Sequence, residues 1–130
     1  MVLVDSSPWI DLLGARSSRE ADLLERWLRQ GEPVAVSGVV VQEVLQGVRA
    51  DLDFVRLRAR LGRLVFLRAD RDVHAEAARL YRKARMRGWS VPAADALIAA
   101  TASAHGVPVL TCDRAHFRAL ERVSKLRVFP

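Results

Sequence analysis

Short apolar runs alternate along this chain with longer segments of helical periodicity. The apolar runs occupy residues 2–4, 33–36, 64–67, 107–111 and 126–129, and each is short enough to be a buried strand. Between them, apolar residues recur at the spacing of one helix face, and glycine often stands where a helix would end, as at Gly31, Gly88 and Gly106. Strands separated by helices favour parallel pairing. The expected fold is α/β, a three-layer α/β/α sandwich with a mainly parallel central sheet.

Local signals indicate where several of the helices begin. Ser6 or Ser7 can cap a short first helix, and Ser17 with Glu20 forms a capping-box pattern before the second. Ser37 can cap the segment 38–48. Further helices are expected from Asp51, from Asp70 or Asp72 to Gly88, from Pro92 to Gly106 and from Arg114 to Leu120.

Length and composition favour an ordinary globular protein. With 130 residues, 51% of them hydrophobic, the chain can build a real core, and we expect one domain spanning residues 1–130. The single Cys112 cannot form an internal disulfide, and Asp5 and Asp11 interrupt the apolar stretch that a signal peptide would need. No run reaches the roughly 20 apolar residues of a membrane span. A cytoplasmic protein without a membrane partner is therefore expected.

The charge balance is basic. There are 21 Lys and Arg against 15 Asp and Glu, a net charge of +6, which favours a polyanionic partner such as nucleic acid. Only Lys83 and Lys125 are lysines, and an excess of arginine can also reflect coding composition. The charge becomes informative only if acidic residues lie inside a basic rim, where a cation can bridge them to phosphate.

Four acidic residues are candidates for such a cation site. Asp5 and Asp113 each follow an apolar run, so both are expected at the carboxyl ends of strands, where ligands bind in open α/β sheets. Asp95 shares the stretch 93–102 with only one other polar residue, and Glu43 is the only charge from residue 37 to 48. Singly, each has a simpler explanation: capping for Asp5 and Asp113, the helix dipole for Asp95, and exposure to solvent for Glu43.

Taken together, the four carboxylates point to a hard divalent ion. Gathered at one end of a sheet they would repel one another unless a cation neutralised them, and oxygen ligands favour Mg²⁺, with Mn²⁺ as a substitute. Zinc is disfavoured, because Cys112 is alone and the histidines have no ligand spacing. Mg²⁺ held in this way can activate water for attack on phosphorus. Ser6 and Thr111, beside two of the acids, are candidate supporting hydrogen-bond donors.

With these residues identified, the chain resembles a PIN domain, and most closely a VapC-type ribonuclease toxin of a bacterial toxin–antitoxin pair. The matching segments are residues 2–13, 37–47, 92–102 and 111–117, so the resemblance covers essentially the whole chain. It implies a metal-dependent endoribonuclease in which Asp5 and Asp95 are the principal Mg²⁺ ligands and Glu43 and Asp113 complete the site. Ser6 and Thr111 would support these carboxylates.

The chain departs from the family at one point. Many relatives carry a further carboxylate shortly after the fourth motif, where this sequence has Ala115 and His116. The pattern therefore does not support a fifth acid or a well-held second metal ion. His116 itself, like the other histidines, is interpreted as a surface or locally satisfied residue.

The resemblance also implies partners: an RNA substrate, a second copy of the chain in a homodimer, and a cognate antitoxin whose tail lies in a groove and blocks the site. Two basic stretches are candidate contacts for the RNA backbone; they comprise Arg56, Arg60 and Arg63, and Arg79, Arg82 and Lys83. Two other readings remain open from the residues alone, a receiver-like signalling domain and a catalytically silent nucleic-acid or partner-binding module. The motifs do not distinguish RNA from DNA.

Overall fold

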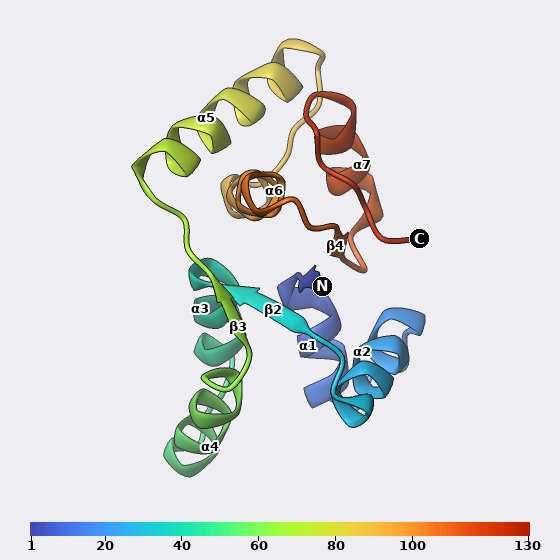
Figure 1. The fold of residues 1–130 in the computed structure, drawn as a ribbon, viewed down its shortest axis with the longest axis vertical. Coiled ribbons are helices and arrows are strands. Elements are labelled where there is room, and N and C mark those ends of the chain that lie inside the picture. Colours follow the sequence, from blue (N-terminus) through green and yellow to red (C-terminus); the bar gives the residue numbers. More distant parts are fainter.

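The computed structural model describes all residues 1–130, as a parallel sheet with helices on both faces (Figure 1). The strands are β1 (Val2–Val4), β2 (Val34–Ser37), β3 (Val65–Leu67) and β4 (Val109–Leu110). The helices are α1 (Ser6–Leu13), α2 (Arg19–Gln30), α3 (Gly38–Gln46), α4 (Asp51–Leu61), α5 (Arg71–Met86), α6 (Ala93–His105) and α7 (Arg114–Arg122). This architecture confirms the expected α/β/α sandwich.

The strand order of the sheet reverses beside β1. The order is β3-β2-β1-β4, and every pairing is parallel. The chain moves outward from β1 to β2 and β3, then returns to the other side of β1 as β4. Ligands of open α/β sheets bind where the strand order reverses, outside the carboxyl ends of the strands. In this chain that position lies between β1, which leads to Asp5, and β4, which leads to Asp113.

The prediction of a last strand over residues 126–129 is wrong. Residues 126–129 form only an isolated parallel bridge, in which Val128 pairs with Val109. Phe129 donates its amide to the Val109 carbonyl at 2.8 Å, and Val109 donates to the Arg127 carbonyl at 2.9 Å. Because β4 is only two residues long, it offers too little backbone for a longer ladder. Leu126 and Val128 are nevertheless buried, which explains the apolar pattern of this segment.

The cap of the second helix also differs from the expected one. Ser18, not Ser17, is the N-cap of α2, and its hydroxyl accepts the Ala21 amide at 3.1 Å. Glu20 then stands one position too early to complete a capping box. It pairs instead with Arg114 at the start of α7, at 3.2 Å. A contact distant in sequence has therefore replaced a local one.

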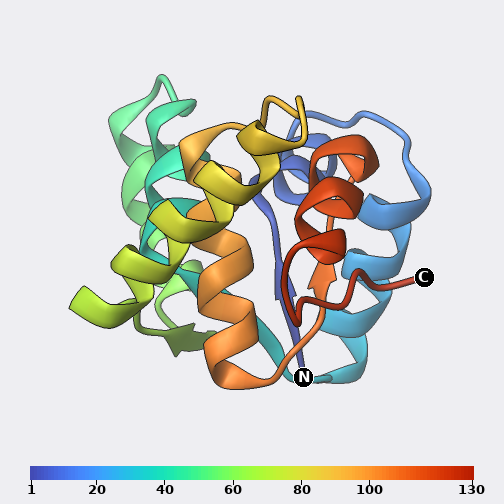
Figure 2. The same ribbon diagram turned by 90° about the horizontal axis from the view of Figure 1, so that it is seen from above.

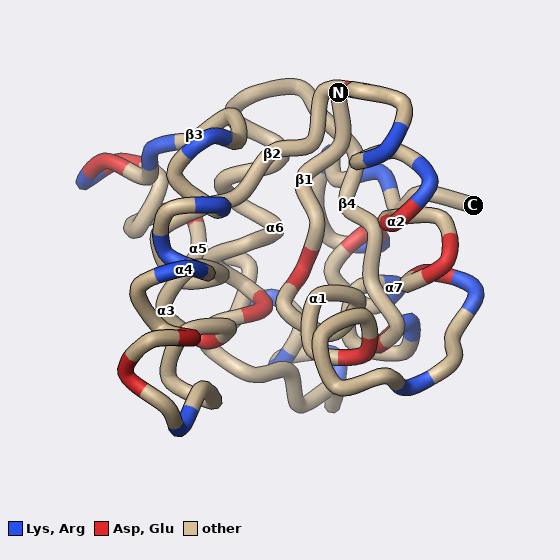
Figure 3. Tube along the Cα trace, turned by 90° about the horizontal axis from the view of Figure 1, so that it is seen from below, with Lys and Arg blue, Asp and Glu red and all other residues tan.

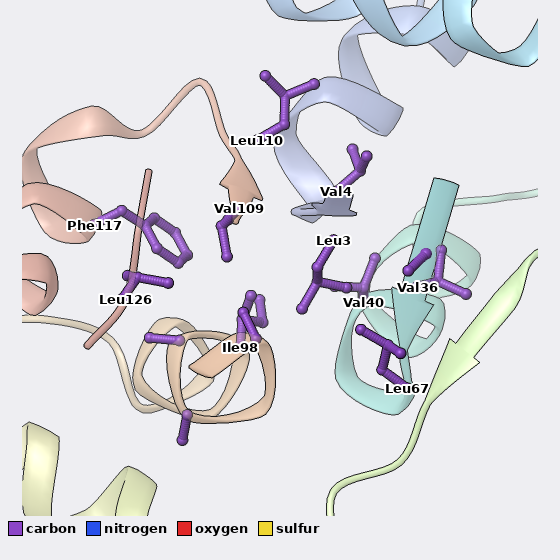
Figure 4. Packing of buried hydrophobic residues seen from close by; sticks show 14 of the residues in the cluster. Leu3, Val4, Val36, Val40, Leu67, Ile98, Val109, Leu110, Phe117 and Leu126 are labelled. Atoms are coloured by element: carbon purple, nitrogen blue, oxygen red, sulfur yellow. The ribbon is translucent and has the colours of Figure 1, made fainter. Parts of the chain in front are cut away.

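The core positions α6 against the sheet. In Figures 1 and 2, α5, α6 and α7 cover one face of the sheet, while α1 and α2 lie on the other. Ile98 of α6 is fully buried and packs among Leu3, Val109 and Phe117 (Figure 4). Burying α6 on nearly all sides fixes the direction in which its first turn, with Asp95, faces. No helix has the length and hydropathy needed to cross a bilayer.

Candidate metal site

Asp5 is both a helix cap and part of a larger hydrogen-bond network. It is the N-cap of α1, and its Oδ1 accepts the Ser6 amide at 2.8 Å. Its other oxygen, Oδ2, accepts hydrogen bonds from the Thr111 hydroxyl at 2.8 Å and from the Ser7 hydroxyl at 3.1 Å. The residue is 3% exposed. Three donors therefore hold a buried carboxylate in one orientation at the end of β1.

The same hydroxyls join the loops that follow β1 and β4. Thr111 Oγ1 accepts the Asp113 amide at 2.9 Å, and Ser7 Oγ accepts the Cys112 amide at 3.0 Å. Asp5 and the backbone of Asp113 are thus fixed relative to each other through two shared side chains. The sequence indicated Ser6 and Thr111 as supports, but Ser7 donates its hydroxyl to Asp5, whereas Ser6 contributes its backbone amide.

His116 lies between two of the carboxylates, which the sequence did not indicate. Its Nδ1 is 2.7 Å from Asp113 Oδ2 and 3.1 Å from Asp95 Oδ2. One ligand atom from each of these three residues falls within 4.8 Å of the others. The available signal was the spacing of three between Asp113, the N-cap of α7, and His116 in the first turn of that helix, which brings the two side chains close together. His74 and His105, by contrast, contact the backbone carbonyls of Asp70 and Arg68, as satisfied surface residues do.

Glu43 does not point freely into solvent. Its Oε1 is buried and has no hydrogen-bond partner. Partial burial raises the pKa of Glu43, the charge of Asp5 raises it further, and the Ser6 hydroxyl offsets part of the increase. The side chain on α3 is therefore close enough to Asp5 for their charges to repel.

The pKa values of Asp5 and Asp95 are also raised, so the ionised form of each is disfavoured. Burial is the main reason that the pKa of Asp5 is raised; its three hydrogen bonds oppose this, and the charge of Asp113 adds to it. Burial, followed by the charges of Asp5 and Asp113, raises the pKa of Asp95 to about 6, against the opposing effect of His116. A cation among these residues would remove the repulsion that raises each pKa.

The residues present fit a hard divalent ion. Four carboxylates supply oxygen ligands, one imidazole supplies a nitrogen, and the unpartnered Glu43 Oε1 is a buried acceptor that lacks a donor. Such a donor set suits Mg²⁺ or Mn²⁺. Figure 3 shows the acidic stretch at the end of β1 near the centre of the molecule, with the basic stretches mainly on the surrounding elements.

The six basic residues expected to contact RNA do not form one rim. Arg56 and Arg60 line a groove of about 510 Å³ with Ile10 and Leu13, between α1, α3 and α4. Arg63 is exposed just after α4, whereas Arg79, Arg82 and Lys83 are exposed on α5, which lies on the other side of the sheet (Figure 1). Arg79 is already paired with Glu76 at 3.0 Å. The two expected basic stretches thus lie on different surfaces of the molecule.

A parallel sheet with carboxylates near the point where its strand order reverses is the arrangement of an α/β protein whose acidic residues could hold a metal ion. Comparison with known families is more specific: the PIN domain model matches residues 2–123. The chain belongs to the PIN domain family. The resemblance seen in the sequence is confirmed, and the receiver-like alternative is excluded.

Named relatives are similar over nearly the whole chain. Ribonuclease VapC11 of Mycobacterium tuberculosis is 31% identical over 130 residues, which cover 98% of this chain and 96% of the relative. A solved toxin–antitoxin complex from Klebsiella pneumoniae contains a chain of 26% identity with a TM-score of 0.73, covering 90% of both chains. The VapBC2 structure from Rickettsia felis, at 18% identity, shares the fold with a TM-score of 0.77 and coverage of 99% and 98%.

Proposed function

We propose that this protein is a Mg²⁺-dependent endoribonuclease, the toxin of a toxin–antitoxin pair. The observation that carries the proposal is the convergence of Asp5, Glu43, Asp95 and Asp113 near the carboxyl ends of β1 and β4. Relatives named as VapC ribonucleases, similar over almost the full length, support RNA as the substrate. The net charge of +6 is consistent with a polyanionic partner.

Each carboxylate has a role that its surroundings suit. Asp5, oriented by three donors, and Asp95, fixed by the buried α6, would hold the ion. Glu43, whose Oε1 has no partner, or Asp113, whose side chain is 44% exposed, would orient the attacking water and accept its proton. When bound, the ion supplies an activated water and stabilises the charge that develops on phosphate. Hydrolysis leaves a 3′-hydroxyl and a 5′-phosphate.

The donor set also bears on the choice of metal. The oxygen ligands favour Mg²⁺, and Mn²⁺ would substitute for it, because the imidazole of His116 is a better ligand for Mn²⁺ than for Mg²⁺. Metal specificity would therefore depend on whether the His116 ring stays among the carboxylates when an ion is bound.

An antitoxin and a second copy of the chain are the proposed protein partners. The groove between α1, α3 and α4 exposes Ile10 and Leu13, and carries Arg56 and Arg60 at its edge. A tail with apolar and acidic side chains is complementary to such a groove, which lies beside the helix that Asp5 caps. For the homodimer, the support is the family and the exposed apolar residues outside this groove, such as Phe66.

Cleavage of a single-stranded RNA, followed with its DNA counterpart, tests the proposal. Asp5→Asn and Asp95→Asn should each lower metal-dependent cleavage by more than the roughly 10- to 100-fold that loss of an outer-shell partner costs. Asp22→Asn, an exposed acid on α2, is the matched control and should cleave normally. Undiminished cleavage by a rigorously purified Asp5→Asn/Asp95→Asn double variant would overturn the assignment. Mg²⁺ titration by calorimetry separates the enzyme from a silent binding module, which has no reason to bind the ion.

A further inference from the structure

A partly exposed tryptophan stands in the loop that leads into the helix of Asp95. Trp89 follows α5, and its backbone is fixed by the way that helix ends. Trp89 donates its amide to the Ala84 carbonyl at 3.0 Å, and Gly88 donates to Arg85 at 2.9 Å, which together form a Schellman motif. Gly88 adopts φ +79, a conformation that glycine reaches without strain. The backbone of Trp89 is therefore fixed by the end of α5.

Two arginines distant in sequence lie over the Trp89 ring. The Arg87 guanidinium is 5.4 Å from the centre of the Trp89 ring, and the Arg122 guanidinium of α7 is 5.7 Å away. Both arginines are exposed and neither forms an ion pair within the chain. Their guanidinium groups remain free to bind an anion.

The surroundings of Trp89 are strongly basic. From residue 77 to 92 the sequence holds five basic and no acidic residues. A hollow of about 350 Å³ lies beside the ring, and it is lined by Tyr81, Arg85, Gly88, Trp89 and Ser90. Two aromatic rings and several unpaired arginines at one place are the combination that single-stranded nucleic acid requires, because bases stack on rings while cations contact phosphates.

The position of this cluster relates it to the carboxylates. Trp89 precedes Asp95 by six residues, so the two are separated by at most about 20 Å along the chain. Figure 2 shows the loop between α5 and α6 at the same end of the molecule as the start of α6 and the end of β1. An RNA strand cleaved at the carboxylates can therefore extend over the indole within a few nucleotides.

We infer that Trp89, with Arg87 and Arg122, forms a subsite that binds single-stranded RNA beside the cleavage position. A nucleobase enters the hollow that Tyr81 and Trp89 both line and packs against these rings, while the arginines contact the flanking phosphates. The inference rests on the proposed ribonuclease function for its choice of RNA. It adds a substrate contact on α5 and α7, away from the groove that Arg56 lines.

Binding of a fluorescent single-stranded RNA, measured by anisotropy in the presence of a chelator so that no cleavage occurs, tests the subsite directly. Trp89→Ala should weaken binding about 5- to 100-fold, the loss expected for one stacked base, and Trp89→Phe should weaken it less. Arg87→Gln with Arg122→Gln should reduce the slope of log affinity against log salt by about 1.4, as for two lost phosphate contacts. The matched control is Arg19→Gln with Arg26→Gln, which removes the same charge from exposed positions on α2.

Equal RNA affinity for the Arg87/Arg122 variant and its charge-matched control would overturn the inference, whatever the cleavage assay shows. Normal RNA binding by the Trp89→Ala variant would also overturn the inference. Loss of thermal stability, or dissociation of a dimer to a monomer in sedimentation, would then assign Trp89 a structural role. Failure of the ribonuclease proposal gives a different result: no cleavage by the wild-type chain with any metal, although RNA binding still depends on Trp89. With an active enzyme, Trp89→Ala should raise the KM for a long RNA but not for a dinucleotide.

Discussion

Asp5 shows why single residues are hard to interpret from sequence. As a lone aspartate before a helix it is explained by capping, and the structure confirms that it does cap α1. Its second oxygen is nevertheless engaged by Thr111, which lies 106 positions away in the sequence. Asp5 therefore caps a helix and also joins the loops after β1 and β4, and the proposed metal site draws on the second of these contacts.

The raised pKa of Asp95 predicts how metal binding depends on pH. Burial and the charges of Asp5 and Asp113 bring this pKa to about 6, above the ordinary 3.8, so protons compete with the ion up to that pH. Affinity measured by calorimetry should therefore rise between about pH 5 and pH 7 and level off above. An affinity independent of pH across this range would contradict the expectation, and Asp95→Asn should abolish both the binding and its pH dependence.

The stability of the metal-free protein changes with pH in the opposite direction to the metal affinity. A pKa raised in the folded state means that the contribution of Asp95 to stability is complete below about pH 4 and is lost as the pH rises through about 6. Above about pH 6 the ionised Asp95 therefore destabilises the metal-free protein, at the pH values where the expected affinity for an ion is highest. The binding of a cation reverses the loss.

At the scale of elements, helices and strands followed the sequence wherever a local pattern determined them. The buried β1 and the Ala-rich α6 appear where the apolar pattern placed them. The prediction was wrong where a contact distant in sequence determined the local structure. Glu20, for example, pairs with Arg114 instead of completing a capping box. The last expected strand failed for a similar reason, since its length depends on its two-residue partner.

Helix α5 offers a test of capping without the complication of a metal site. Asp70 Oδ1 accepts the Val73 amide at 2.9 Å on an exposed surface. Asp70→Ala should cost about 1 kcal/mol of unfolding free energy in denaturant, because the amide loses its acceptor. Asp70→Asn keeps an acceptor oxygen and should cost only a few tenths of a kcal/mol. Both variants should cleave RNA at the wild-type rate, and a cleavage defect would contradict a purely local role.

At the scale of the whole molecule, the fold carries an electrostatic cost that the proposed metal ion would relieve. Loops after β1 and β4, together with α3 and α6, bring carboxylates together although each pKa rises as a result. A purely structural arrangement would have avoided this repulsion. The cost is consistent with a site selected for binding, at some expense of stability.

This cost predicts opposite effects of one substitution with and without metal. Asp5→Asn removes a buried charge and its repulsion, so in chelator the variant should melt at a higher temperature than the wild type. With Mg²⁺ at 100 times its Kd, the wild type should gain about 2.7 kcal/mol, whereas the variant should gain little. Differential scanning calorimetry in the two buffers measures both effects. A metal-induced shift as large in the variant as in the wild type would show that the ion binds elsewhere.

The amino-acid sequence by itself determined the α/β class, most of the elements and the four carboxylate candidates, because these depend on local periodicity and on the residue that follows each strand. The tertiary structure alone decided that Glu43 Oε1 is buried without a partner, that His116 lies between Asp95 and Asp113, and that the basic residues divide between two surfaces. These features depend on how helices distant in sequence pack across the sheet. Side-chain burial and charge–charge distance are properties of that packing, and no local pattern encodes them.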